Sequence, residues 1–119
     1  MGDIRLGEVE SKFADIIWNN EPLRPIELEK LAAAELKWKR TTTLTILKRL
    51  CERGIFQNKD RIITSLISRE EFYALQSEKF VNDTFGGSLP AFLTAFSSRK
   101  KLSEKEIEEL KKVIERMRG

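Results

Sequence analysis

The stretch RTTTLTILKRLCERGIFQNKDRIITSL, residues 40–66, combines the pattern of a helix with the pattern of two short strands. In its first part, four apolar residues recur at the spacing of one helix face: Leu44, Leu47, Leu50 and Cys51. Its second part has β-branched and aromatic runs at 55–57 and 62–66, with the polar turn 58–61 between them. We therefore expect a helix over 41–52, with those four side chains facing inward, followed by a β-hairpin.

The opposite face of the expected helix is polar and basic. Thr42, Thr45 and Arg49 lie at i, i+3 and i+7, with Lys48 beside them. Hydroxyl and basic side chains on a helix can reach phosphates and base edges in the major groove of B-DNA. Threonine also caps helix N-termini well, and Thr41 is a candidate for that role. The threonines alone therefore do not distinguish a DNA-reading helix from an ordinary one.

The charge of the chain is unevenly distributed. Residues 37–61 contain eight basic residues and two acidic ones, although the whole chain carries a net charge of only +3. A basic segment on an otherwise acidic body is typical of a protein that binds nucleic acid. A solvated, lysine-rich helix face would give the same count, so charge by itself leaves both interpretations open.

Two further helices are expected before this stretch, over 6–20 and 24–36, from the spacing of their apolar residues. Three helices followed by a hairpin is the order of a winged helix-turn-helix, in which 24–36 and 41–52 form the helix-turn-helix and the hairpin forms the wing. Lys59 and Arg61 lie at the tip of that wing. The threonines, the basic face and the hairpin together favour DNA binding.

Residues 68–119 predict three more helices. Ser68 and Ser103 each precede, by three residues, a glutamate that completes a capping box, and Ser88 opens a short helix between them. The segment 97–101 is polar and is expected to be a linker. The last helix has apolar residues at 3, 4, 3 spacing, a heptad-like stripe typical of a helix that pairs with another helix.

The apolar stripes of these helices are too narrow for a self-sufficient domain. They either pair with a second copy of the chain, as DNA-binding winged helices on palindromes commonly do, or fold back on the winged helix of their own chain. We favour a homodimer. The residues expected to form its interface are Phe72, Leu75, Phe80, Leu89, Phe92, Leu93, Phe96, Ile107, Leu110, Ile114 and Met117.

Composition excludes several kinds of chemistry. The 119 residues contain no histidine and one cysteine, Cys51, so no intrachain disulfide, Cys/His zinc site or histidine-based catalysis is available. No metal or cofactor is therefore expected. Carboxylate or lysine chemistry is still available, but no motif points to it, so we expect a binding protein rather than an enzyme. No apolar stretch is long enough to span a membrane, and the charged start of the chain lacks the apolar core of a signal peptide. We expect a cytoplasmic protein without membrane insertion.

The predicted fold is mainly α with a small β-hairpin: a winged helix-turn-helix DNA-binding domain over 1–67, followed by a helical dimerisation domain over 68–119.

The chain resembles the penicillinase repressor family, the BlaI/MecI/CopY type of bacterial repressor. The resemblance runs in the same order along essentially the whole chain. The matching stretches are LGEVE (6–10), IIW (16–18), RTTTLTILKRL (40–50), GI (54–55), SREEF (68–72), FGGS (85–88) and LSEKEIEEL (102–110).

The resemblance implies a homodimeric winged-helix repressor that binds inverted-repeat operators in double-stranded DNA and controls a resistance or stress operon. It assigns dimerisation to the C-terminal helices. It also implies a possible partner, a membrane sensor with a cytoplasmic protease domain that triggers cleavage of the repressor. The residues to which it assigns DNA reading are Arg40, Thr41, Thr42, Thr45, Lys48 and Arg49.

Three features depart from the family. The cleaved bond of the protease-regulated branch joins Asn to Phe, whereas the matching position here is Ala95-Phe96, so we interpret Phe96 as a residue of the dimer core. The copper-responsive branch uses cysteine pairs near its C-terminus, and this chain has only Cys51. The wing is also short for the family, which predicts fewer contacts between the wing and the DNA backbone.

Two alternatives remain from the sequence alone. One is a winged helix that serves as a protein-interaction module. The other is a repressor of the same fold that a ligand, rather than proteolysis, releases from DNA.

Overall fold

The computed structural model describes residues 6–119. It divides into two compact units, one that ends at Ser77 and one over Glu78–Gly119. The helices and strands of the described residues are α1 (Glu8–Asn20), α2 (Pro25–Leu36), α3 (Arg40–Glu52), β1 (Phe56–Lys59), β2 (Ile62–Ser65), α4 (Arg69–Phe85), α5 (Leu89–Arg99) and α6 (Glu104–Arg116). The mainly helical fold with one small hairpin, expected from the sequence, is confirmed.

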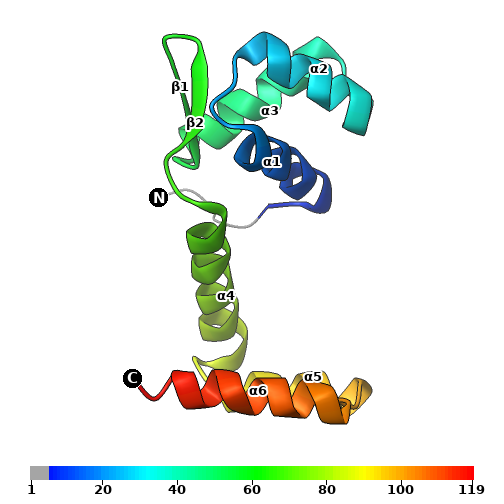
Figure 1. Ribbon diagram of the computed structural model, residues 1–119, viewed down its shortest axis with the longest axis vertical. Coiled ribbons are helices and arrows are strands. Elements are labelled where there is room, and N and C mark those ends of the chain that lie inside the picture. The colour runs from blue at the N-terminus through cyan, green and yellow to red at the C-terminus, as the bar shows by residue number, and fades with distance from the viewer. Residues whose placement is uncertain (1–5) are drawn as a thin grey trace. The chain divides into compact units, whose positions relative to one another are not determined.

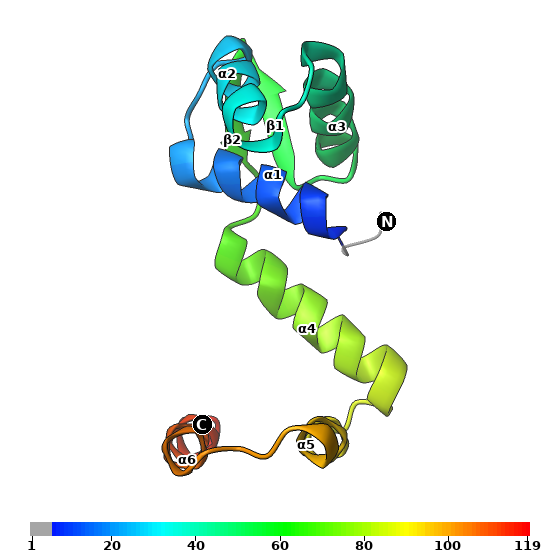
Figure 2. The ribbon, with the colours of Figure 1, turned by 90° about the vertical axis from the view of Figure 1, so that its right-hand side faces the viewer.

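The N-terminal unit consists of three helices with the hairpin beside them (Figure 1), and in the view of Figure 2 α1 crosses below α2 and α3. Its core is apolar and continuous. The core side chains are Phe13, Ala14, Ile16, Ile17, Leu23, Leu28, Ala32, Leu47, Leu50, Ile55, Phe56, Ile63 and Phe72. Every element from α1 to the start of α4 contributes to this core, so burial of apolar surface holds the helix-turn-helix and the wing in one unit.

The hairpin is tighter than the four-residue turn predicted from the sequence. Lys59 pairs with Ile62, so Asp60 and Arg61 alone form the loop, and both have left-handed backbone angles, with φ of 54° and 62°. Positive φ at both central residues is the geometry of a type I′ turn, whose twist matches that of the flanking strands. The prediction failed because Asn58 and Lys59 read as turn residues, although they pair within β1.

A residue between α1 and α2 extends the sheet at one point. Leu23 is buried and exchanges two backbone hydrogen bonds with Ile63 of β2, at 3.3 and 2.8 Å. The carboxylate of Glu21 accepts hydrogen bonds from the backbone N–H and hydroxyl of Ser65. These contacts attach the wing to the helices, and sequence patterning did not reveal them because the pairing involves a single residue.

The first half of α4 belongs to the N-terminal unit. Trp18 of α1 donates a hydrogen bond from Nε1 to the carbonyl of Ile67, at 3.0 Å, and its ring lies 5.7 Å from that of Phe72. Arg69 forms an ion pair with Asp15, at 2.8 Å, which raises the pKa of Arg69, and it stacks over the ring of Tyr73. For this reason the compact unit extends beyond the boundary at 67 expected from the sequence.

Local capping explains where the C-terminal helices begin. The Ser88 hydroxyl accepts from the N–H of Ala91, and the Ser103 hydroxyl accepts from the N–H of Glu106. Glu106 in turn accepts from the N–H of Ser103, which completes the predicted capping box and lowers the pKa of Glu106. The predicted linker over 97–101 is partly wrong, because α5 continues to Arg99.

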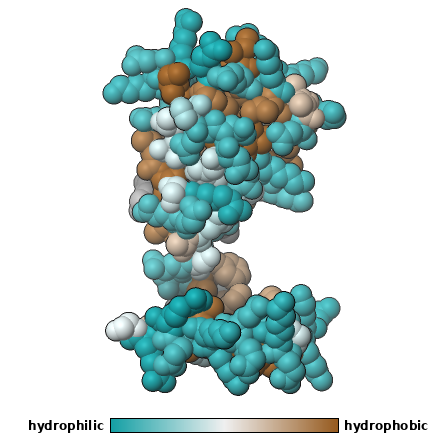
Figure 3. Space-filling model, viewed as in Figure 1, coloured by the Kyte–Doolittle hydropathy of each residue, from teal (hydrophilic) through white to brown (hydrophobic). Residues whose placement is uncertain are grey.

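The C-terminal unit has rings in contact but no buried centre. Phe85 and Phe92 lie 5.6 Å apart, Phe80 lies within 6.1 Å of both, and Phe92 is 6.2 Å from Phe96. No residue of α5 or α6 is buried. In the view of Figure 3, the α6 side of this unit is mainly hydrophilic. The unit therefore keeps most of its apolar side chains at least partly open to solvent.

Candidate nucleic-acid interface

Helix α3 begins one residue earlier than predicted. Lys39 has extended backbone angles and is the N-cap, so Arg40 is the first helical residue and Thr41 is inside the helix rather than its cap. Thr43 is fully buried, and its hydroxyl donates to the carbonyl of Lys39 at 3.2 Å. The threonine run failed as a cap signal because Thr43, rather than Thr41, bonds to the backbone at the helix start.

The outer face of α3 has the composition predicted from the sequence. Leu47 and Leu50 are buried with Thr43, whereas Leu44 and Cys51 are only half-buried. Six side chains predicted to read DNA are exposed: Arg40, Thr41, Thr42, Thr45, Lys48 and Arg49. A surface of hydroxyl, ammonium and guanidinium groups can donate to phosphates and to purine acceptors in the major groove.

Both arginines of α3 form ion pairs with carboxylates on other helices. Arg40 donates from Nε to Oε1 of Glu29 on α2 at 3.0 Å. An Nη of Arg49 lies 3.8 Å from a carboxylate oxygen of Glu10 on α1. Sequence analysis missed both partners, because the residues are far apart in the chain and no local pattern relates them.

The wing presents the other predicted contacts. Lys59 ends β1 and Arg61 occupies the second loop position, and both side chains are exposed. Both belong to the compact unit that contains α3. The predicted helix and wing residues are thus available on one folded unit, which is the requirement for a winged helix to contact a groove and an adjacent phosphate backbone together.

The described residues contain nothing that suggests a metal centre. Over residues 6–119, no group of three or more Cys, Asp or Glu side chains is arranged to hold a metal ion. Cys51 is half-buried, and burial, together with the charge of Glu52, raises the pKa of its thiol. A thiol held protonated in this way is a poor metal ligand and a poor nucleophile.

The predicted dimerisation residues fall into two groups. Phe72 is only 1% exposed and is packed in the N-terminal core against Trp18. The others are half-buried or exposed: Leu75, Phe80, Leu89, Phe92, Leu93, Phe96, Ile107, Leu110, Ile114 and Met117. Leu75 belongs to the N-terminal unit, and we call the nine residues of the C-terminal unit the open apolar face, since none of them is buried.

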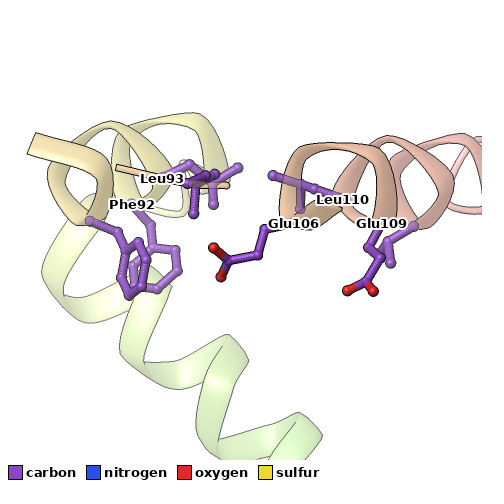
Figure 4. A pocket seen from close by; sticks show the side chains of 8 residues that line it. Phe92, Leu93, Glu106, Glu109 and Leu110 are labelled. Atoms are coloured by element: carbon purple, nitrogen blue, oxygen red, sulfur yellow. The ribbon is translucent and has the colours of Figure 1, made fainter. Parts of the chain in front are cut away.

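An open groove of about 350 Å³ lies between helices α5 and α6 within this face. Phe92, Leu93 and Leu110 line it, and Figure 4 shows them with the carboxylates of Glu106 and Glu109. Ala95 and Phe96, the position that matches the cleaved bond of the protease-regulated branch, lie inside α5. Cleavage there would require α5 to open locally, since a protease binds an extended chain.

Comparison with known proteins agrees with this architecture. The profile of the penicillinase repressor family matches residues 6–116. The penicillinase repressor of Bacillus licheniformis is 24% identical, over 93% of this chain and 90% of the relative. The methicillin resistance regulatory protein MecI of Staphylococcus aureus strain Mu50 is 26% identical, over 92% of each chain. MecI of Mammaliicoccus sciuri is 25% identical over the same shares.

No helix among residues 6–119 is both long and apolar enough to cross a membrane. With a family profile that spans all the described elements, and relatives aligned over nearly their whole length, the chain belongs to the penicillinase repressor family, whose members are transcriptional regulators rather than enzymes.

Proposed function

We propose that the chain is a cytoplasmic protein that represses transcription as a homodimer. It binds an inverted-repeat operator in double-stranded DNA. Each N-terminal unit binds one half-site, with α3 in the major groove and the wing tip on the backbone. The names of the relatives, which refer to penicillinase and methicillin resistance, make a resistance operon the proposed target.

The observation that carries this proposal is the exposed face of α3. Its threonines and basic residues are solvent-accessible, while the opposite side of the same helix is buried in the core. A helix so oriented presents polar donors outward on a rigid support, as base reading requires. Lys59 and Arg61 on the wing supply phosphate contacts of the kind that do not depend on sequence.

The homodimer is supported by the open apolar face of the C-terminal unit. Its exposed members include Phe80, Phe96, Ile114 and Met117, and helices α5 and α6 bury no residue. An apolar surface of this kind on a small helical unit gains stability only when a partner covers it. A second copy of the chain is the simplest partner, because a palindromic operator has two equivalent half-sites and each binds one DNA-binding unit.

A gel-shift titration tests DNA binding. The protein is titrated on palindromic duplex from its own upstream region and on random duplex, at two salt concentrations. We expect the palindrome to bind ~10³-fold more tightly or better, and both affinities to fall as salt rises. Salt-sensitive binding without preference would contradict sequence-specific repression. No binding at all would favour the alternative, a winged helix that binds other proteins.

A charged substitution tests the dimer. Leu110→Glu places a carboxylate in the α5–α6 groove and should give monomers whose N-terminal unit stays folded but binds the palindrome weakly. Lys112→Glu, at an exposed position of the same helix, is the control and should remain dimeric. Sedimentation velocity distinguishes the two states. A Leu110→Glu protein that remained dimeric would show that this groove is not the interface.

A further inference from the structure

The first residue of the DNA-reading helix has an unusual partner. The Arg40 side chain is 74% exposed, yet its inner nitrogen, Nε, donates to Glu29 Oε1 at 3.0 Å. The Glu29 side chain is only 17% exposed. A largely buried carboxylate on α2 thus bonds to the inner edge of an arginine that extends from the N-terminus of α3 into solvent.

Glu29 is carried by a helix that the core anchors. It follows the fully buried Leu28 on α2 and lines an open hollow of about 240 Å³ with Ile26, Lys30, Ala33 and Trp38. The Trp38 ring is itself fixed, 4.9 Å from the ring of Phe13. Because α2 is packed by its buried face and Trp38 is anchored to α1, the carboxylate is presented to Arg40 from a rigid support.

A guanidinium has five N–H donors in one plane, of which Nε carries one and the two Nη groups carry the rest. A carboxylate on Nε fixes the plane of this fork. The Nη edge can then form the bidentate pair with O6 and N7 of guanine, the most common specific contact of arginine in the major groove. Without the Glu29 carboxylate, the long Arg40 side chain stays mobile until DNA binds. Binding must then restrict it, which lowers the affinity for DNA.

Electrostatics argues against a role for Glu29 in general attraction to DNA. A carboxylate near the start of a DNA-reading helix repels phosphates and neutralises part of the charge of Arg40. The position of Glu29 favours DNA binding only if orienting the Arg40 guanidinium gains more affinity than the added negative charge loses. The pair of Arg49 and Glu10 does not support the same argument, because its 3.8 Å separation is too long for a hydrogen bond.

We propose that Glu29 is a positioning residue for operator recognition: it orients Arg40 so that the Nη edge reads a guanine of the half-site. This inference rests on the proposed DNA-binding function. It makes Glu29, which does not itself touch DNA, a determinant of sequence specificity.

The test compares Glu29→Ala with Glu29→Gln in the full-length protein, on the preferred palindrome and on random duplex. Glu29→Ala should weaken palindrome binding about tenfold, because the guanidinium loses its support. The same variant should bind random duplex as tightly as the wild type or more tightly, because a negative charge has been removed. Glu29→Gln keeps an oxygen that accepts from Nε and should retain most of the specificity.

Two controls separate positioning from charge and from folding. Glu35→Gln removes one negative charge from an exposed site of the same helix and should change both affinities equally and only slightly. A double-mutant cycle with Arg40→Ala should show that Glu29→Ala causes no further loss once Arg40 is absent. Thermal unfolding of each variant verifies that the N-terminal unit is intact.

The outcomes are distinct. The proposal is supported if Glu29→Ala weakens binding to the palindrome, leaves binding to random duplex unchanged or tighter, and causes non-additive losses in the cycle. If Glu29→Ala tightens binding to both duplexes equally, Glu29 acts only through its charge and the proposal is overturned. Equal weakening of binding to both duplexes, or additive losses in the cycle, also overturns it. A wild-type protein without any preference for the palindrome overturns the proposed function itself, and the inference with it.

Discussion

At the scale of single residues, the loop of the wing has a backbone conformation that is unfavourable for its side chains. Arg61 occupies a left-handed position of a two-residue hairpin loop, with φ of 62°. Glycine and asparagine are the usual residues there, and another side chain costs roughly 1–2 kcal/mol. An arginine at this position is therefore unfavourable for folding, and the proposed phosphate contact at the wing tip explains its presence.

Replacement of Arg61 by glycine should have opposite effects on stability and on DNA binding. Arg61→Gly should stabilise the fold by about 1 kcal/mol, since glycine adopts positive φ without strain. It should also weaken binding to all duplexes alike and reduce the salt dependence. Asp60→Gly relieves similar strain while it removes an anion, so it should not weaken DNA binding. Thermal unfolding and gel shifts measure both quantities, and destabilisation by Arg61→Gly would contradict this interpretation.

Phe72 shows how burial distinguishes a core residue from an interface residue. Phe72→Ala should destabilise the N-terminal unit by about 3–5 kcal/mol, because the ring is fully enclosed against Trp18. Leu75→Ala, at an exposed position on the same helix, should cost well under half of that. Denaturant titration followed by tryptophan fluorescence measures both. If Phe72→Ala changed only the dimer dissociation constant, the placement of Phe72 in the core would be wrong.

At the scale of elements, short-range signals set the helix starts. The capping box of α6 is the clearest case, because Ser103 and Glu106 each accept a hydrogen bond from the other's backbone N–H. The bond from the Ser103 N–H favours the ionised form of Glu106 and lowers its pKa. A carboxyl with a lowered pKa in the folded state contributes stability above its unfolded pKa and loses it as the pH falls through the folded value.

Acid should therefore weaken the start of α6. As the pH falls below the usual pKa of a glutamate carboxyl, protonation of Glu106 should shift the Ser103 amide resonance and fray the first turn of α6. Glu106→Gln keeps a capping side chain that does not titrate, so this shift should be absent. An NMR pH titration follows both proteins. An unchanged Ser103 resonance in the wild type would show that the box does not form in solution.

At the scale of the whole molecule, the two units differ in where their stability arises. The N-terminal unit has a continuous core of thirteen buried hydrophobic residues, whereas α5 and α6 have no buried residue. The first unit can therefore fold within one chain. In the proposed homodimer a partner covers the open apolar face of the second, so we expect the order of that unit to depend on protein concentration.

Dilution should reveal this difference without any mutation. Both tryptophans of the chain, Trp18 and Trp38, lie in the N-terminal unit, so their fluorescence reports on that unit alone. Below the dimer dissociation constant, far-ultraviolet circular dichroism should lose helical signal while the fluorescence maximum stays unchanged. Parallel loss of both signals would show that the two units unfold together and would contradict separate stability.

Local sequence patterns predicted the order of the helices and strands and the face of α3 that meets solvent. Apolar spacing in 40–66, the β-branched runs and the serine capping boxes are local signals, because the groups that satisfy one another lie within a few residues. From them follow the winged helix-turn-helix order and the exposure of Thr42, Thr45 and Lys48, which the structure shows.

How distant residues contact one another could be seen only in the folded chain. The attachment of α4 to Trp18, the bridge between Leu23 and Ile63, and the contact of Arg40 with Glu29 join positions that no periodicity relates. Such contacts depend on how helices cross and on which side chains the packed core holds in place. The sequence therefore predicted which residues face outward, and the fold determined which carboxylates bond to the arginines among them.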